Sequence, residues 1–209
     1  MSNFELIVEQ TRILSEAYAQ PWRKYHSNNH ITNMMNLLDD HVRNVGGVTE
    51  EEEGILSDAI LYHDVVYNIP SKPCQNEIDS ALYYRNDMSK FDNSSLDENQ
   101  IDRVVSLIVA TAHHFDGTLY GDHLINLMLD FDIMSFVAPY NYFVETNKAI
   151  DAEYLAFLPA EEVHAGREKF LRSILKNRSL RYRALPSRAA LEVIAYQNVA
   201  RYLREEYKA

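Results

Sequence analysis

Cysteine is nearly absent from this sequence, whose 209 residues include Cys74 alone. One cysteine cannot form an internal disulfide, and it cannot supply the several thiolates of a cysteine-rich structural zinc site. Residues 1–7 contain Glu5 and no basic residue, which is unlike a secretory signal peptide. We therefore expect a protein of a reducing compartment, by default the cytoplasm.

Long apolar runs and an excess of positive charge are missing as well. No run approaches the roughly 20 apolar residues that a membrane-spanning helix needs. The chain carries 20 Lys and Arg against 31 Asp and Glu, a formal net charge of −11. This balance disfavours wrapping nucleic acid or lying on an anionic membrane through bulk charge. We therefore expect no nucleic-acid and no membrane partner, and the composition predicts no oligomeric state.

One segment departs from this acidic average. Residues 167–188 contain eight basic side chains and one acid, a local charge of +7 against −18 in the remainder. Such a segment can bind an anionic substrate, a partner, or the protein's own acidic face, and the sequence leaves these three open. The basic residues are Arg167, Lys169, Arg172, Lys176, Arg178, Arg181, Arg183 and Arg188.

Glycine and proline are scarce, at six each, and no alternation of apolar and polar residues lasts long enough for a sheet. Apolar residues recur at helical spacing instead. We therefore predict an all-α fold of about eight or nine helices in one compact domain over residues 1–209. Its core is expected at about 20–140, with C-terminal helices at about 141–209 packed on that core.

Several residues predict where these helices begin and end. Gly46-Gly47 is a typical C-terminal signal. Thr49 with Glu52 predicts a capping box for a helix that runs to about Val66, and Ser95 with Glu98 predicts another for a helix that reaches about His114. The other predicted boundaries are Pro21, Pro159, Pro186 and the N-cap Ser187.

Polar residues stand where an apolar helix should be buried. In residues 124–136, nine of thirteen side chains are apolar and cover every side of a helix, which is typical of a buried helix. The same stretch holds Asp130 and Asp132. An unpaired buried carboxylate costs several kcal/mol, so each needs a hydrogen-bonding partner, such as an Arg, or a cation.

Three other apolar segments carry histidine or aspartate. His63-Asp64 lies near the end of residues 55–66, His113-His114 follows residues 104–112, and His26 and His30 stand before a fourth apolar helix. Any one of these is commonly an ordinary buried histidine with its own hydrogen bonds. Four together favour one shared cause, a metal site, because imidazole and carboxylate ligate divalent metals.

Spacing narrows this metal site. Asp130 and Asp132 are two residues apart on a helix and point nearly opposite ways, so one of them is expected to reach the metal. His26 and His30 are four apart and share a helix face, as in some zinc sites, but no Glu follows His26. A zinc-protease site is therefore disfavoured.

The order of these residues resembles the HD superfamily of metal-dependent phosphohydrolases, and within it the small predicted HD phosphohydrolases. The resemblance spans roughly residues 20–200. The matching patterns are Arg23-x-Tyr25-His26-x-x-x-His30-Ile31, Tyr62-His63-Asp64 with Tyr67-Asn68, Asn76-Glu77-x-x-Ser80-Ala81, Ala110-Thr111-x-x-His114, Leu129-Asp130-x-Asp132-Ile133, Gly166-Arg167 and Glu192-x-x-Ala195-x-x-Asn198.

This resemblance implies an HD-type helical bundle with one divalent metal ion, which can be Mn, Mg, Fe, Co, Ni or Zn. The implied ligands are His30, His63, Asp64 and Asp132. Asp132 matches the last aspartate of the family pattern better than Asp130 does. We therefore keep Asp130 as an alternative or supporting ligand, and His113 likewise.

Three signatures of better-known relatives are missing. The enzymes that cleave guanosine tetraphosphate carry Glu-Asp just after the HD pair, where this chain has Val65-Val66-Tyr67. HD nucleotidases carry Glu three residues after the aspartate, where Tyr67 stands here. The glycine-tyrosine-proline motif of cyclic dinucleotide phosphodiesterases is also absent. The usual acid must therefore be replaced by another residue or omitted.

The resulting hypothesis is metal-assisted hydrolysis of a small phosphate ester or anhydride, with a nucleotide as the expected substrate. The expected catalytic residues are Asp64, Glu77 and His114, and the expected substrate-binding residues are Arg23, His26, Tyr67 and Arg167. Two alternatives stay open. The first is a non-catalytic helical module that binds a metal, a nucleotide or a partner. The second is a phosphodiesterase.

Overall fold

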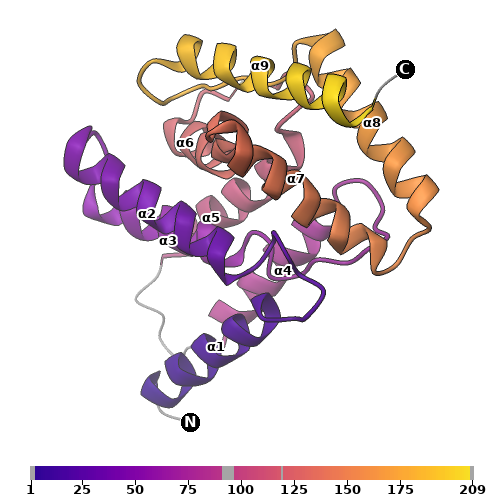
Figure 1. Cartoon of the computed structure of the whole chain (residues 1–209). Coiled ribbons are helices and arrows are strands. Elements are labelled where there is room, and N and C mark those ends of the chain that lie inside the picture. The colour runs from indigo at the N-terminus through magenta and orange to yellow at the C-terminus, as the bar shows by residue number, and fades with distance from the viewer. Residues whose placement is uncertain (1–2, 91–96, 119, 208–209) are drawn as a thin grey trace. The chain divides into compact units, whose positions relative to one another are not determined.

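Residues 3–90, 97–118 and 120–207 are described by the computed structural model, and in these ranges the chain forms nine α-helices, two short 3₁₀ helices and no strand (Figure 1). The prediction of an all-α fold with eight or nine helices is therefore confirmed. None of the described helices has an apolar stretch long enough to cross a membrane.

The helices belong to two compact units, Met1–Ala112 and His113–Ala209. The predicted division between a core and C-terminal helices, at about residue 140, falls inside the second unit at the start of its second α-helix. The first unit contains α1 (Asn3–Tyr18), α2 (Asn28–Asn44), α3 (Glu50–Tyr62), α4 (Gln75–Met88) and α5 (Glu98–Ala110). The second contains α6 (His123–Asp132), α7 (Tyr140–Leu155), α8 (Ala160–Asn177) and α9 (Arg188–Glu206), and the 3₁₀ helices are η1 (Thr111–His113) and η2 (Met134–Val137).

Helix α3 is the centre of the first unit, because it packs against α2, α4 and α5. Leu56, Ala59 and Ile60 on this helix are fully buried. Tyr62, at its C-terminal end, donates its hydroxyl to Asp87 of α4 at 2.7 Å and accepts a hydrogen bond from Gln10 of α1. A helix buried on most sides places whatever follows it in the interior, and His63 follows α3 directly.

The ends of the helices in the first unit agree with several sequence signals. Thr49 and Glu52 form the predicted capping box at the start of α3. Helix α2 stops before Gly46, which has a φ of +76° and donates its backbone N–H to the His41 carbonyl at 2.9 Å. Ser95 lies outside the described residues, and the described capping box of α5 is formed by Asp97 with Gln100.

Helix α3 is shorter than predicted, because it ends at Tyr62 rather than near Val66. After Tyr62 the chain leaves the helix, and the Val66 N–H bonds to the Ser80 hydroxyl of α4 at 3.1 Å. A side chain fourteen residues away thus takes over a backbone donor that a longer helix would have used.

The second unit buries α6 as the sequence predicts: Leu124, Leu127, Met128 and Leu129 are inaccessible to solvent. The stretch predicted as one helix divides into α6 and η2. Helices α7 and α8 begin after Pro139 and Pro159. Ser187 occupies the predicted N-cap position of α9 in a left-handed conformation, and its hydroxyl makes no capping bond.

Candidate metal centre

Three of the predicted ligands come together in the first unit. One ligand atom each from His30, His63 and Asp64 lies within 4.8 Å of the other two. The His63 Nε2 is 3.1 Å from the Asp64 Oδ2, and the rings of His30 and His63 are 5.4 Å apart between centroids. His30 is 6% exposed, His63 1%, and the Asp64 side chain 13%. Nitrogen and carboxylate donors at this spacing are typical of a divalent metal site.

The local fold explains how neighbouring residues reach one point. His30 lies on the buried face of α2, in line with Met34 and Leu38. His63 is the C-cap of α3, and Asp64 follows in the turn beyond the helix. Because α3 ends at Tyr62, the roughly 100° that separates adjacent residues on a helix does not keep His63 and Asp64 apart.

The tautomer of His63 suits a metal ligand. Its Nδ1 is 2.9 Å from the carbonyl oxygen of Ile60. A carbonyl oxygen can only accept a hydrogen bond, so Nδ1 carries the proton and Nε2 has its lone pair on the side of Asp64. Such an outer hydrogen bond is the usual way in which a protein orients a metal-binding histidine. A cation shared by Nε2 and the carboxylate would stabilise both, and the residues therefore fit a divalent metal.

Arg23 holds the backbone of the His63-Asp64 turn. Its guanidinium donates to the carbonyl oxygen of Asp64 at 2.6 Å and to that of Val65 at 3.0 Å, and the residue is 5% exposed. The same group lies 5.2–5.6 Å from the ring centres of Tyr18, Trp22 and Tyr67. The sequence suggested Arg23 as a substrate ligand; in the structure its donors position the turn that carries Asp64.

His26 and Tyr67, two further predicted substrate residues, stack on each other. Their ring centroids are 4.1 Å apart with an angle of 27°. Trp22 stacks on Tyr67 at 6.0 Å, and His26 is 6.1 Å from His30. Tyr67, which stands where HD nucleotidases carry Glu, is therefore part of an aromatic wall beside His30.

The loop after His63-Asp64 is fastened to α4 by two motif residues whose role the sequence left open. Asn76 accepts the N–H of Asn68 at 3.0 Å and donates to its carbonyl at 3.2 Å. Ser80 accepts the N–H of Val66 at 3.1 Å and donates to its carbonyl at 3.2 Å. Glu77, a predicted catalytic residue, lies in the first turn of α4 directly after Asn76 and is half-buried.

In the second unit, the adjacent histidines bind different acids. The His114 Nε2 is 2.7 Å from the Asp132 Oδ2, and both side chains are largely buried. The buried His114 Nδ1 has no hydrogen-bond partner among the described residues. The His113 Nδ1 is 2.5 Å from Asp116 at the surface. The roles of Asp132 as fourth ligand and of His113 as a supporting ligand stay predictions from the sequence.

Asp130 is fully buried and fastens a loop. Its carboxylate accepts the backbone N–H groups of Arg183, Ala184 and Leu185 at 2.7–2.9 Å. Burial raises the pKa of Asp130, and these three hydrogen bonds oppose that rise. The loop contacts thus provide the partner that the sequence required for this buried acid.

Arg167, the remaining predicted substrate residue, is engaged within its own unit. Its Nε is 3.0 Å from Asp151, and its terminal nitrogen donates to Asn147 at 2.5 Å. The side chain is 14% exposed. Burial raises the pKa of Asp151, and the charge of Arg167 opposes that rise. Arg167 therefore acts as an internal counter-ion in the described structure.

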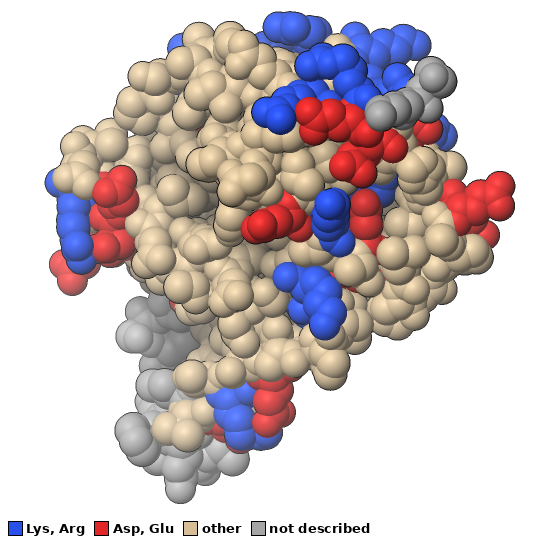
Figure 2. All heavy atoms as spheres, in the orientation of Figure 1, with Lys and Arg blue, Asp and Glu red and all other residues tan. Residues whose placement is uncertain are grey.

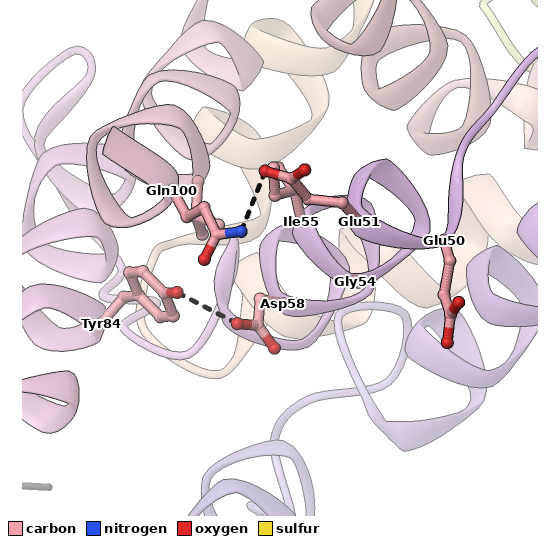
Figure 3. A pocket seen from close by; sticks show the side chains of 8 residues that line it. Glu50, Glu51, Gly54, Ile55, Asp58, Tyr84 and Gln100 are labelled. Atoms are coloured by element: carbon pink, nitrogen blue, oxygen red, sulfur yellow. Dashed lines mark hydrogen bonds between the residues drawn. The ribbon is translucent and has the colours of Figure 1, made fainter. Parts of the chain in front are cut away.

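A pocket of about 610 Å³ lies elsewhere on the first unit (Figure 3) and includes none of the three grouped ligands. Tyr84 donates to Asp58 at 3.0 Å, and Gln100 donates to Glu51 at 2.9 Å across it. Burial raises the pKa of Asp58, and the Tyr84 hydrogen bond opposes that rise. No sequence pattern points to this pocket, because its acids resemble an ordinary solvated helix face.

The site therefore consists, in the first unit, of His30, His63 and Asp64 with Arg23 as a brace and an aromatic wall alongside. The His114–Asp132 pair belongs to the second unit. Neither a model of a known protein family nor a curated protein matches the chain.

Proposed function

We propose that this chain is a metal-dependent phosphohydrolase that acts on a nucleotide or another small phosphate ester or anhydride. The observation that carries the proposal is the buried group of His30, His63 and Asp64, whose ligand atoms lie within 4.8 Å of one another. The ordered HD-type pattern in the sequence adds the reaction class.

The donor set supports a divalent metal ion at this group. His30 and His63 supply imidazole nitrogen, and Asp64 supplies carboxylate oxygen, with Asp132 as the further ligand that the sequence resemblance implies. When bound, such an ion lowers the pKa of a water molecule and offsets negative charge on a phosphoryl group. Asp64, at the exposed edge of the group, is suited to orient the attacking water.

Two residues are candidates for proton transfer. His114 has a buried Nδ1 without a partner among the described residues, while its Nε2 is held by Asp132 at 2.7 Å. Glu77 is half-buried and belongs to the helix turn that fastens the HD loop. A group that transfers a proton must come within hydrogen-bond reach of the substrate, so both are proposals that mutagenesis separates.

Substrate contacts are proposed at the aromatic wall and not at the two arginines. Tyr67 and His26 are half-buried and adjoin His30, so a planar base or sugar would find an apolar surface there. Arg23 and Arg167 donate to protein groups instead. Charge neutralisation of the phosphate would then come from the metal ion.

The test is a phosphatase screen of the full chain with Mn, Mg, Co, Ni, Fe and Zn in parallel, using nucleoside mono-, di- and triphosphates and a dinucleotide diester. His63→Ala and Asp64→Asn are expected to lower turnover at least a hundredfold and to abolish metal binding, while His123→Ala at an exposed histidine is the matched control. Asp132→Asn in the same titration tests the predicted fourth ligand.

Each outcome of this screen has a defined meaning. Full turnover in either site variant would refute the proposal. Metal binding without turnover on any substrate would leave a metal-binding module and remove the enzymatic claim. Preference for the diester would shift the reaction class to a phosphodiesterase.

A further inference from the structure

The positive charge of the second unit is concentrated at the junction of α8 and α9. The first unit holds 18 acidic and 8 basic residues, whereas the second holds 13 and 12. In Figure 2, Lys and Arg side chains gather at the top of the view, where Figure 1 shows α8 and α9. Nearly all of the acidic excess thus belongs to the first unit, and the second, with a net charge of −1, carries a basic patch.

Most cations on this surface have no acidic partner among the described residues. Arg172 is paired with Glu168 at 2.7 Å. Within the described ranges, no carboxylate lies within 4.0 Å of the five exposed cations Lys169, Lys176, Arg178, Arg181 and Arg188. Five solvated cations within twenty residues repel one another. An anionic partner would relieve this repulsion and be attracted by all five charges. Within the second unit, therefore, no acid among the described residues neutralises these five cations.

The surface also has a groove and an apolar stripe. A shallow groove of about 460 Å³ on α8 is lined by small and charged side chains, namely Ala165, Ser173, Lys169, Arg172, Lys176 and the Glu168 that pairs with Arg172. On the first half of α9, Val193 is 55% exposed and Ile194 41%. These two are the large exposed apolar residues next to the basic loop, and with Ala190 and Gln197 they follow helical spacing.

Two contacts hold the basic loop against α9. The Arg178 guanidinium lies 4.4 Å above the ring of Tyr196 on α9. The Tyr182 N–H of the loop bonds to Glu192 at 3.2 Å. The loop therefore folds back along the first half of α9, on the side of the helix that carries Glu192 and Tyr196.

We propose that this face, formed by the C-terminal half of α8, the loop 178–187 and the first half of α9, is the docking surface for an acidic amphipathic helix of a partner protein. Apolar residues of the partner at helical spacing would cover Val193 and Ile194, and its acids would meet the cations of α8 and of the loop. The inference is independent of the proposed hydrolase activity, because none of these residues belongs to the metal group.

Other anionic occupants fit the surface less well. A nucleic acid strand would need exposed aromatic rings for base stacking, but Tyr182 and Tyr196 are buried. Two exposed aliphatic side chains bury little area in a bilayer. They suit an amphipathic helix better, because such a helix binds through a few apolar residues at helical spacing.

The test measures binding of a fluorescein-labelled 20-residue peptide of Glu, Leu and Ala with Leu at helical spacing, by anisotropy with the full chain. The expected result is a micromolar Kd that weakens with added salt. Lys176→Glu with Arg181→Glu is expected to weaken it at least tenfold, and Val193→Asp likewise. Arg204→Glu, an exposed arginine on the same helix, is the matched control and is expected to change it less than twofold.

Four results would overturn this proposal. They are no binding of the peptide, equal binding of a peptide with the same residues in scrambled order, tighter binding of a dT20 strand or of vesicles with 30% phosphatidylserine, and self-association that the double variant abolishes. Circular dichroism and the Tm, measured on each variant, show that a loss of binding comes from the surface and not from misfolding.

Discussion

At the scale of single residues, buried polar side chains indicate where a functional site lies. In the structure these side chains have different partners. His63 presents a lone pair beside Asp64 because its other nitrogen donates to Ile60. Arg23 braces the turn, and Asp130 fastens a loop. The sequence shows that such groups need partners, but it does not say whether a given partner is a cation or a backbone amide.

Arg23 is expected to control the geometry of the metal group. Lysine keeps the charge, but its single nitrogen cannot reproduce the fixed fork in which two guanidinium nitrogens donate to the Asp64 and Val65 carbonyls. Arg23→Lys should therefore weaken Mn binding by about tenfold, roughly 1.4 kcal/mol. Isothermal titration checks this, with Arg12→Lys in an exposed ion pair as the control. Unchanged affinity in the Arg23 variant would contradict the positioning role.

Asp130 is expected to act on stability and not on metal binding. In Asp130→Asn, the amide nitrogen would face backbone N–H donors that now bond to a carboxylate. We expect a loss of about 2–4 kcal/mol in the free energy of unfolding, measured in urea. The metal stoichiometry is expected to stay at the wild-type value. A lost metal ion at unchanged stability would instead restore Asp130 as a ligand.

At the scale of elements, the sequence predicts the helices well and their ends less well. Helical spacing and the Thr49 capping box act within a few residues, so a local pattern contains them. The end of α3 depends on Ser80, which is fourteen residues away and belongs to another helix. The three ligands could be named from the sequence, but their meeting point follows from this early helix end.

The contact between α3 and α4 at Asp58 is expected to make stability depend on pH. Burial raises the folded-state pKa of Asp58 above its ordinary value. The protonated form is then favoured by folding, so its contribution is present at low pH and is lost as pH rises through the folded-state pKa. Relative to wild type, Asp58→Asn should gain about 1 kcal/mol of stability between roughly pH 3 and neutral pH.

Urea unfolding across this range measures the effect. Tyr84→Phe removes the hydrogen bond that opposes the rise in the pKa of Asp58. In this variant the pH-dependent loss of stability should therefore occur at a higher pH than in the wild type. A stability difference between the wild-type chain and the Asp58→Asn variant that does not vary with pH would contradict this account.

At the scale of the whole molecule, the structure shows how the net charge is divided between the two units. The total of −11 comes from the sequence alone. The division into Met1–Ala112 and His113–Ala209 shows that the first unit carries nearly all of it. Composition could not reveal this, because the boundary depends on which helices pack together.

Metal binding is expected to stabilise the folded chain as a whole. A ligand at a hundred times its Kd adds about 2.7 kcal/mol, which is roughly a 5–10 °C rise in Tm for a chain of this size. Scanning calorimetry with and without Mn measures the rise, and EDTA should reverse it. The rise should persist in His123→Ala and vanish in Asp64→Asn. An equal rise in both variants would mean that the metal binds elsewhere.

The aromatic wall has an optical consequence. Trp22 is the single tryptophan of the chain, and it stacks on Tyr67, which in turn stacks on His26 next to His30. All indole emission of this protein therefore originates beside the group of His30, His63 and Asp64. The chain contains its own fluorophore for the site, so that occupancy by a quenching ion such as Mn or Co can be followed in the unlabelled, unmodified protein.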